Sequence, residues 1–348
     1  MGLFSFAVPA AVAQVTFEWA TIGHPGNAPD PQDGDSGTPG VQSFGAVEYT
    51  FRIAKTEVTN AQYAAFLNAV AASDPHGLYN VDMASPQGGI LRMGAAGGYS
   101  YVVASGREQY PVINTSFLDA MRFVNWLHNG QGAGGTESGV YQVASGLTET
   151  RSVGARFFIP SEHEWYKAAF FQPHSQGGDT DDFWAWSTSS NLAPAPGTDL
   201  NVDGAVGGST PVGSYPPNAN GVFDMGGNAF EWNEALVTPT RRGLRGDSWL
   251  ANSYPNGTYA AFRVSNVPEY EDLEDVGIRV ARPAPCPADL SGPGGEPDDV
   301  LNSSDFLAFL NLWSTSDPSA DLAPSGGNGV WDSSDFLAYL NLYAQGCP

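Results

Sequence analysis

The stretch that decides the fold runs from Asn220 to Glu234 and reads NGVFDMGGNAFEWNE. In it, Asp224 stands one residue before a Gly-Gly-Asn segment. Paired glycines permit positive φ angles or a close approach of the backbone to a ligand. A carboxylate beside bent backbone lies near carbonyl oxygens, and such hard oxygen ligands suit Ca²⁺. The stretch therefore predicts either a calcium site or a turn in which the Asp224 side chain binds its own backbone.

Two shorter motifs follow this stretch, RGDSW at 245–249 and GIRVA at 277–281. Together the three segments resemble the formylglycine-generating enzyme (sulfatase-modifying factor) family, whose C-terminal half carries G-x-x-D-M-x-G-N-x-x-E-W, R-G-G-S-W and G-F-R-x-A. Earlier segments match the family in the same order: EVTNAQY at 57–63, RFVNWL at 122–127 and PSEHEWYKAA at 160–169. The resemblance covers residues 17–282 and implies an α+β domain with little regular secondary structure, similar to a C-type lectin.

Local patterns place the first elements of this domain. Residues 47–53 alternate apolar and polar side chains, which predicts a half-buried strand. Thr59 or Asn60 can cap a helix whose apolar residues recur at 63, 66, 67 and 70. A second helix is expected after Ser116, and a third starts at Pro160-Ser161, where Ser161 and Glu164 can form a capping box.

The composition limits the partners and the location. The 348 residues carry 14 Lys and Arg against 37 Asp and Glu, a formal net charge of −23. Such a chain is repelled by nucleic acid and by anionic membranes, so nucleic-acid binding is not expected. Residues 1–13 end in Ala-Val-Ala and read as a signal peptide, with a buried first strand as the alternative. No other apolar run is long enough to span a bilayer. We therefore predict a secreted, periplasmic or cell-surface protein.

The cysteine count bears directly on the activity that the resemblance implies. Formylglycine formation in the family uses copper held by two cysteine thiolates, which suit soft Cu(I). Here the corresponding positions are Ala251 and Asn256, or Leu250 and Pro255 if the register is counted backwards from Arg263. Neither choice supplies a thiol, because the two cysteines of the chain are Cys286 and Cys347. The five histidines are scattered without metal-ligand spacing. Copper-dependent oxidation is therefore not expected.

Calcium is the cofactor that the resemblance favours. One family site corresponds to Asp224 and Glu231 with the carbonyl groups of Gly227 and Ala229. A second corresponds to Asn191 and Leu192 combined with Asp203 and Ala205, although ordinary turns remain an alternative for both sets.

Residues 284–348 differ in composition and begin within the stiff Pro-Ala-Pro boundary at 283–285. The tail beyond this boundary has no Lys or Arg, and SSDFLAFLNLW at 303–313 recurs as SSDFLAYLNLY at 333–343. Two loop-helix units of this kind resemble a dockerin, or paired EF-hands, and imply a small all-α domain with a cohesin-like partner. The loops offer carboxylates as calcium ligands at Asp289, Asp305, Asp321 and Asp335. Both loops are longer than the 12-residue EF-hand loop, so solvated acidic loops are the alternative.

Two further expectations concern the interior of this tail. A bond between Cys286 and Cys347 would close almost the whole tail into one loop, worth roughly 4 kcal/mol in the chain-entropy model. The two repeats are expected to form antiparallel helices that pack through six apolar residues: Phe306, Leu307, Leu310, Phe336, Leu337 and Leu340.

These observations lead to one functional hypothesis and two alternatives. The hypothesis is an exported, non-oxidase family member: residues 14–283 bind a peptide or glycan, and the tail attaches the protein with the help of calcium. The predicted binding groove consists of six residues near the lost oxidase centre: Asp247, Ser248, Trp249, Tyr254, Tyr259 and Arg263. The alternatives are a sulfatase-modifying oxidase that converts a substrate cysteine to formylglycine, and a structural surface or matrix protein.

Overall fold

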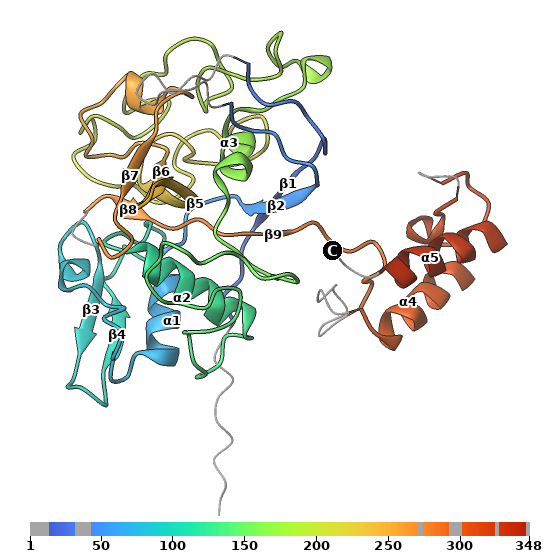
Figure 1. Ribbon diagram of the computed structural model, residues 1–348, viewed down its shortest axis with the longest axis horizontal. Coiled ribbons are helices and arrows are strands. Elements are labelled where there is room, and N and C mark those ends of the chain that lie inside the picture. Colours follow the sequence, from blue (N-terminus) through green and yellow to red (C-terminus); the bar gives the residue numbers. More distant parts are fainter. Residues whose placement is uncertain (1–13, 32–42, 271–273, 292–300, 324–326, 346–348) are drawn as a thin grey trace, which may run out of the picture. The chain divides into compact units, whose positions relative to one another are not determined.

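The computed structural model describes residues 14–31, 43–270, 274–291, 301–323 and 327–345 (Figure 1). The chain divides into two compact units, Met1–Arg282 and Pro283–Pro348, called here the first and second units. The predicted signal peptide lies outside the described residues. None of the helices in the described ranges has the length and apolar character needed to cross a membrane.

The strands of the first unit form three small sheets. The first has the order β1-β2-β9, with β1 (Trp19–Ile22) antiparallel to β2 (Phe51–Ala54) and β9 (Ala281–Pro283) on the other side. A hairpin pairs β3 (Ile90–Met93) with β4 (Ser100–Val103). The largest sheet has the order β7-β6-β5-β8 and contains β5 (Phe230–Thr238), β6 (Arg241–Arg245), β7 (Val264–Asn266) and β8 (Val276–Gly277). The strand predicted at 47–53 is observed at Phe51–Ala54, so it begins four residues later than expected and ends one residue later.

In the described part of the first unit, the three α-helices each begin at a capping box. Thr59 caps α1 (Asn60–Val70), Ser116 caps α2 (Phe117–His128) and Ser161 caps α3 (Glu162–Phe170). In each box the capping hydroxyl accepts from a backbone N–H three residues on, and the side chain there accepts from the backbone of the capping residue. The predicted caps at Thr59 and Ser161 are confirmed. Short 3₁₀ turns form η1 (Val81–Ala84), η2 (His174–Gln176) and η3 (Asn256–Thr258).

Aromatic side chains form much of the core of the first unit. The ring of Phe66 on α1 lies 5.4 Å from that of Phe123 and 5.3 Å from that of Trp126, both on α2. The mixture of short strands, three helices and long connections agrees with the predicted α+β class. Buried aromatic residues, more than extended sheets, hold the loops of this unit in place.

The second unit is built on two helices, α4 (Ser303–Ser314) and α5 (Ser333–Gln345), with the short turn η5 (Pro318–Ala320) between them. Its central contact is a stacked pair, Phe309 and Tyr339, with ring centroids 4.0 Å apart and planes within 3°. The predicted contact between Phe306 and Phe336 is present, with centroids 6.2 Å apart.

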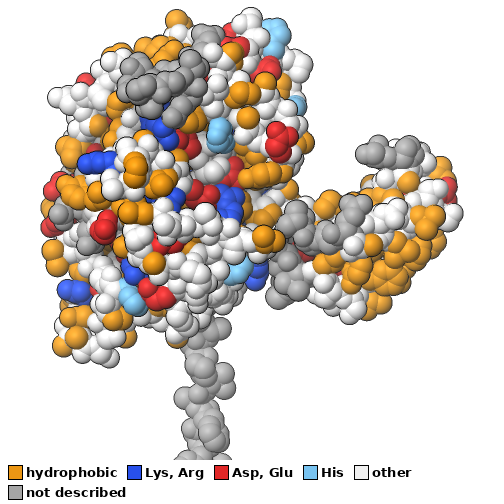
Figure 2. Space-filling model, viewed as in Figure 1, with side chains coloured by type: hydrophobic (Ala, Val, Ile, Leu, Met, Phe, Trp, Pro, Cys, Tyr) orange, Lys and Arg blue, Asp and Glu red, His pale blue; other side chains and the backbone are white. Residues whose placement is uncertain are grey.

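The predicted role of two leucines in this helix pair is wrong. The side chains of Leu307 and Leu337 are 62% and 59% exposed. Figure 2 shows hydrophobic side chains gathered on an exposed face of the helices. Each helix turns Phe309 or Tyr339 inward instead, because an aromatic ring buries more apolar area than leucine at the point where the helices meet.

Candidate functional site

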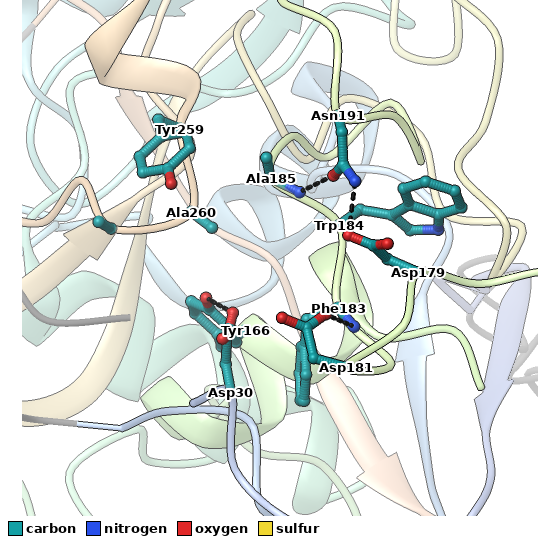
Figure 3. A pocket seen from close by; sticks show the side chains of 11 residues that line it. Asp30, Tyr166, Asp179, Asp181, Phe183, Trp184, Ala185, Asn191, Tyr259 and Ala260 are labelled. Carbon is teal, nitrogen blue, oxygen red and sulfur yellow. Dashed lines mark hydrogen bonds between the residues drawn. The ribbon is translucent and has the colours of Figure 1, made fainter. Parts of the chain in front are cut away.

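A small cavity in the first unit combines carboxylates with aromatic rings. Its volume is about 120 Å³. We call it the acidic pocket, and it is lined by Asp30, Tyr166, Asp179, Asp181, Phe183, Trp184, Ala185, Asn191, Tyr259, Ala260 and Ala261. Figure 3 shows the Tyr259 hydroxyl on one side of an open space and the Asp181 carboxylate on the other.

Segments far apart in the sequence build the acidic pocket. Tyr166 comes from α3, and its hydroxyl donates to Asp30 Oδ2 at 2.7 Å. The loop at 179–185 follows η2, and the residues at 259–261 follow η3. The backbone N–H of Ala260 donates to the carbonyl of Ala185 at 3.0 Å, which joins these two loops across the pocket.

Side-chain hydrogen bonds fix the loop at 179–185. The Asn191 Oδ1 atom accepts from the backbone N–H of Ala185 at 3.0 Å, and its Nδ2 donates to Asp179. This bond from Asn191, helped by the backbone of Thr180, holds the pKa of Asp179 below its ordinary value. Asp179 therefore stays ionised at neutral pH.

The six residues of the predicted binding groove do not all face solvent in the structure. Asp247 and Ser248 are fully buried, and Trp249 is 7% exposed, so these three residues do not offer a surface to a ligand. The Tyr254 hydroxyl donates to the carbonyl of Pro194 at 2.8 Å. Of the six predicted residues, Tyr259 lines the acidic pocket and is 39% exposed.

Arg263, the last residue of the predicted groove, serves a structural ion pair. Its guanidinium binds Glu162, which also pairs with Arg245 at 2.9 Å. Both guanidinium groups stack on Phe44, at 4.7 Å for Arg245 and 5.2 Å for Arg263. Arg263 therefore holds α3 against the segments that follow it in the sequence, instead of facing a groove.

Asp247 occupies the position where the family motif has glycine. Its φ angle is +63°, a left-handed conformation that glycine adopts freely and that Asp tolerates better than most residues. Burial raises the pKa of Asp247 to about 6, against the opposing effect of hydrogen bonds from Ser253 and Ser248. Its Oδ1 accepts from the Ser253 hydroxyl and from the backbone N–H of Ser248, both at 2.9 Å. Through these hydrogen bonds the side chain of Asp247 stabilises the loop that follows β6.

The residues at the copper positions do not fit copper. The side chains of Ala251, Leu250 and Pro255 contain no atom that can bind a metal ion. Asn256 offers an amide, which is a poor ligand for Cu(I). Cys286, the cysteine within the described ranges, belongs to the second unit and is buried there. Among the described residues, no group of three or more His, Cys, Asp or Glu is arranged to hold a metal ion.

The first predicted calcium site lies in a cluster of buried carboxylates. Asp224 is buried and accepts from the backbone N–H of Gly213 at 2.6 Å. Glu231 is already occupied: it accepts from Arg279 at 2.7 Å and from the indole of Trp165 at 2.6 Å. Gly227 and Ala229 lie within the same buried segment. Calcium at this site stays a prediction, and Glu231 would have to give up these bonds in order to bind it.

Glu57 is a further member of this cluster, which the sequence motifs do not indicate. It is fully buried, and its Oε1 accepts from Asn228 Nδ2 at 2.9 Å while its Oε2 lies 3.9 Å from Arg279 Nη2. Burial raises the pKa of Glu57, and the Asp224 carboxylate beside it raises it further. Glu57 stands in the EVTNAQY motif, but its partners Asn228 and Arg279 lie far away in the sequence, so no local pattern points to the cluster.

The residues of the second predicted calcium set have separate partners within the described part of the chain. Asn191 binds Asp179 and Ala185 at the acidic pocket, while Leu192 is 80% exposed. Asp203 and Ala205 lie in an exposed turn, and the residue between them, Gly204, donates its backbone N–H to the carbonyl of Trp249 at 2.8 Å. This set too remains a prediction.

In the second unit, the repeated aspartates bind backbone groups. Asp305 Oδ1 accepts from the N–H groups of Leu290 and Ser291, at 2.9 and 2.8 Å. Asp335 Oδ1 accepts in the same way from Leu322 and Ala323, both at 2.8 Å. These bonds make Asp305 and Asp335 anchors for the loop that precedes each helix, which is a different role from the predicted calcium ligation.

The remaining predicted residues of the second unit are placed as follows. Asp321 accepts from the backbone N–H groups of Asn328 and Gly329. Asp289 is buried, and its backbone N–H donates to the carbonyl of Cys286 at 3.0 Å. Cys347 lies outside the described residues, so its bond with Cys286 stays a prediction.

Comparisons with known proteins agree with the motifs. The family model of the sulfatase-modifying factor enzyme 1-like domain matches residues 42–284. The formylglycine-generating enzyme of Streptomyces coelicolor is 26% identical over 286 residues, 67% of this chain and 78% of that protein. A mouse protein named inactive C-alpha-formylglycine-generating enzyme 2 is 30% identical over 143 residues, 37% of this chain and 44% of its own length. The structure of Treponema denticola variable protein 1 covers 79% of this chain and 98% of its own at 21% identity, with a TM-score of 0.51, and so shares the fold.

Proposed function

The chain belongs to the sulfatase-modifying factor enzyme 1-like family, and from that premise we propose that it is a non-oxidase member whose first unit binds a ligand at the acidic pocket. The ligand class is a peptide or a glycan. The observation that carries the proposal is the absence of any cysteine from residues 14–283, in a family whose oxidases depend on two.

Chemistry at the copper positions supports the loss of oxidase activity. A thiolate pair binds soft Cu(I), and the alkyl and amide side chains found here do not replace it. The mouse relative that bears the word inactive in its name is compatible with a family that includes non-catalytic members. The family scaffold is therefore available for a different role.

The shape of the acidic pocket supports binding as that role. Ligand sites are usually concave, with apolar and aromatic walls and a few convergent polar groups. The pocket has four aromatic residues, three carboxylates and one amide around a single cavity. Two hydrogen bonds hold the wall of the pocket. The indole N–H of Trp184 donates to Gln172 Oε1 at 2.9 Å, and the backbone N–H of Ala260 donates to the carbonyl of Ala185, which joins the two loops.

The remaining parts of the proposal rest on the sequence. Export follows from the Ala-Val-Ala pattern before Gln14. A tail of two similar helices with acidic loops suits attachment to a protein partner, which is the role that a dockerin-like tail implies. Calcium would assist at Asp224 and at the tail loops.

Two measurements test the proposed function. The full chain, Cu(I), O₂ and a cysteine peptide should give no formylglycine above a no-protein control, while the Streptomyces coelicolor relative serves as the positive control. Conversion by this chain would restore the oxidase hypothesis. A peptide and glycan array should show saturable binding that is lost in Trp184→Ala, and its complete failure would favour the structural-protein alternative.

A further inference from the structure

We propose that the acidic pocket recognises a protonated amine, carried either by a lysine side chain of a peptide or by an amino sugar. This inference rests on the proposed function, since it assumes that the acidic pocket is the binding site. It adds the chemical class of the group that enters the pocket.

Charge is the first argument. Asp30, Asp179 and Asp181 line the cavity, and no basic side chain is among its lining residues. Asp179 is ionised at neutral pH, and the bond from Asn191 lowers its pKa further below the ordinary value. A cavity whose charged groups all have one sign attracts an ion of the opposite sign and repels anions.

Nearby arginines do not cancel this charge. The guanidinium of Arg245 lies 5.3 Å from the ring centroid of Tyr166, and the guanidinium of Arg263 lies over the ring of Phe44. Both share the single carboxylate of Glu162, so this group contributes about one net positive charge. Three carboxylates in the pocket against one net positive charge behind it leave the cavity negative.

The aromatic walls distinguish an organic cation from a metal ion. A cation close to an aromatic face gains about 0.5–2 kcal/mol from the ring quadrupole. Trp184 and Tyr259 lie on opposite loops, and Tyr259 is held by an edge-to-face contact with Trp186, with centroids 5.3 Å apart. Because the rings are already fixed, little conformational entropy is lost when a ligand enters. A divalent metal ion prefers oxygen ligands and holds its water, so it gains less from these walls than an ammonium group with attached carbons does.

The size of the cavity limits what enters it. A volume of about 120 Å³ accommodates an ammonium group with a few attached carbons, not a whole peptide or oligosaccharide. The exposed residues Tyr259 and Asn191 stand at the edge of the cavity. We therefore expect one amine-bearing end to enter while the rest of the ligand lies outside.

Acetylation provides the sharpest test, since it removes the charge of an amine and leaves the carrier unchanged. Binding of the full chain is measured by calorimetry to a lysine-containing peptide and to a glucosamine oligosaccharide, each compared with its N-acetylated form. We expect one of the two amine ligands to bind and its acetylated form to bind at least tenfold more weakly. The ligand that binds identifies the source of the amine.

Variants connect the binding to the pocket. Asp181→Asn keeps an oxygen that can accept from the N–H of Phe183, at present 3.2 Å away, and removes one charge. It should weaken amine binding about tenfold, and Trp184→Ala should weaken it as well. The matched control is Asp82→Asn, which removes a charge from the exposed turn η1. Circular dichroism and the unfolding midpoint of each variant verify that it is folded.

The outcomes separate this inference from the proposed function. Equal binding of the acetylated and free forms, with loss in Trp184→Ala, would overturn the amine inference and leave ligand binding intact. Failure of both amine ligands would also overturn it, while the array decides whether the pocket binds another ligand. Equal effects of Asp181→Asn and Asp82→Asn would show general attraction to an acidic protein and would defeat recognition by the pocket.

Discussion

At the residue scale, Glu57, Asp224 and Glu231 share the single guanidinium of Arg279 in the interior of the first unit. Glu231 forms the close pair with Arg279, at 2.7 Å. Burial raises the pKa values of both Glu57 and Asp224, which shows that the interior does not readily hold both as anions. The excess negative charge requires a proton or a bound cation. This requirement makes Ca²⁺ at Asp224 testable through stability.

We expect added Ca²⁺ to raise the unfolding midpoint of the first unit, because a ligand bound by the folded state alone stabilises that state by mass action. Glu57→Gln removes one negative charge and keeps the acceptor that Asn228 uses. This variant should unfold at a higher temperature than wild type in EDTA and should gain less from calcium. Differential scanning calorimetry in EDTA and in millimolar Ca²⁺ measures both effects, with Asp82→Asn as the control. A wild-type midpoint that is the same in EDTA and in calcium would reject the site.

Asp247 gives a prediction about pH at the same scale. Burial raises its pKa to about 6, above the ordinary value of 3.8, so the folded state binds its proton more tightly than the unfolded chain does. The free energy of unfolding therefore falls as pH rises from about 4 to about 6, by up to roughly 3 kcal/mol. Asp247→Asn should raise the unfolding midpoint at pH 8 and leave it nearly unchanged at pH 4. Urea titrations at the two pH values check this, and an equal shift at both would show that ionisation is not the cause.

At the scale of elements, the aspartates at equivalent positions of the repeat have the same structural role. Asp305 and Asp335 each accept from two N–H groups of the preceding loop and from the N–H three residues before them, that of Asn302 or Asp332. Burial by itself raises the pKa of Asp305, but these bonds outweigh it and hold the pKa below its ordinary value. The pKa of Asp335 is also lowered, and the hydrogen bonds from backbone N–H groups, that of Asp332 above all, are the main cause. Both helices therefore depend on ionised carboxylates.

We expect Asp305→Ala to destabilise the second unit by about 1–2 kcal/mol or more, because it removes one half of the capping box that Asp305 forms with Asn302, together with the bonds to the loop. Leu307→Ser is the control, since Leu307 is 62% exposed and should change stability little. A carboxylate whose pKa is lowered by folding stabilises the folded state at pH values above its pKa in the unfolded chain. This stabilisation is lost as the pH falls through the pKa of the folded state. Wild type should therefore lose stability in acid, and Asp305→Ala should lose less. Helix content measured against urea at pH 7 and pH 3 compares the three proteins.

Elements whose signals are local could be predicted from the sequence. The caps at Thr59 and Ser161 follow from residues three positions apart, so their contacts form within one turn of helix. For the tail helices, the prediction is right for the contact between Phe306 and Phe336 and wrong for Leu307 and Leu337, because the SSDFLAFLNLW repeat has apolar residues on more than one face. Only packing against the second helix decides between Leu307 and Phe309.

At the scale of the whole molecule, the acidic pocket could not be predicted in the same way. It joins Asp30, Tyr166, the loop at 179–185 and the residues at 259–261 through contacts between distant segments. Within the sequence, the run DTDDFW at 179–184 was a local signal of acidic and aromatic residues side by side. The family motifs instead predict a binding groove at residues 247–249, and these residues are buried. The motifs identify the family scaffold, while contacts between distant loops determine where the cavity lies.

The last prediction concerns the two compact units, Met1–Arg282 and Pro283–Pro348, which differ in their cysteines. Residues 14–282 contain none, and both cysteines of the chain lie in the second unit. We expect Cys286 and Cys347 to be bonded, which would stabilise this small unit by roughly 4 kcal/mol. Calorimetry of the full chain should therefore show two transitions, of which reductant lowers one.

The variant Cys286→Ser with Cys347→Ser serves as the control for that experiment, because its calorimetric trace should not respond to reductant. Mass spectrometry of a non-reduced digest identifies the bond independently. If reductant moves both transitions, the two units do not unfold independently. If both cysteines of exported protein react with an alkylating agent before reduction, the bond is absent. In that case the packing of α4 on α5, with Phe309 stacked on Tyr339, would have to maintain the second unit without a covalent link.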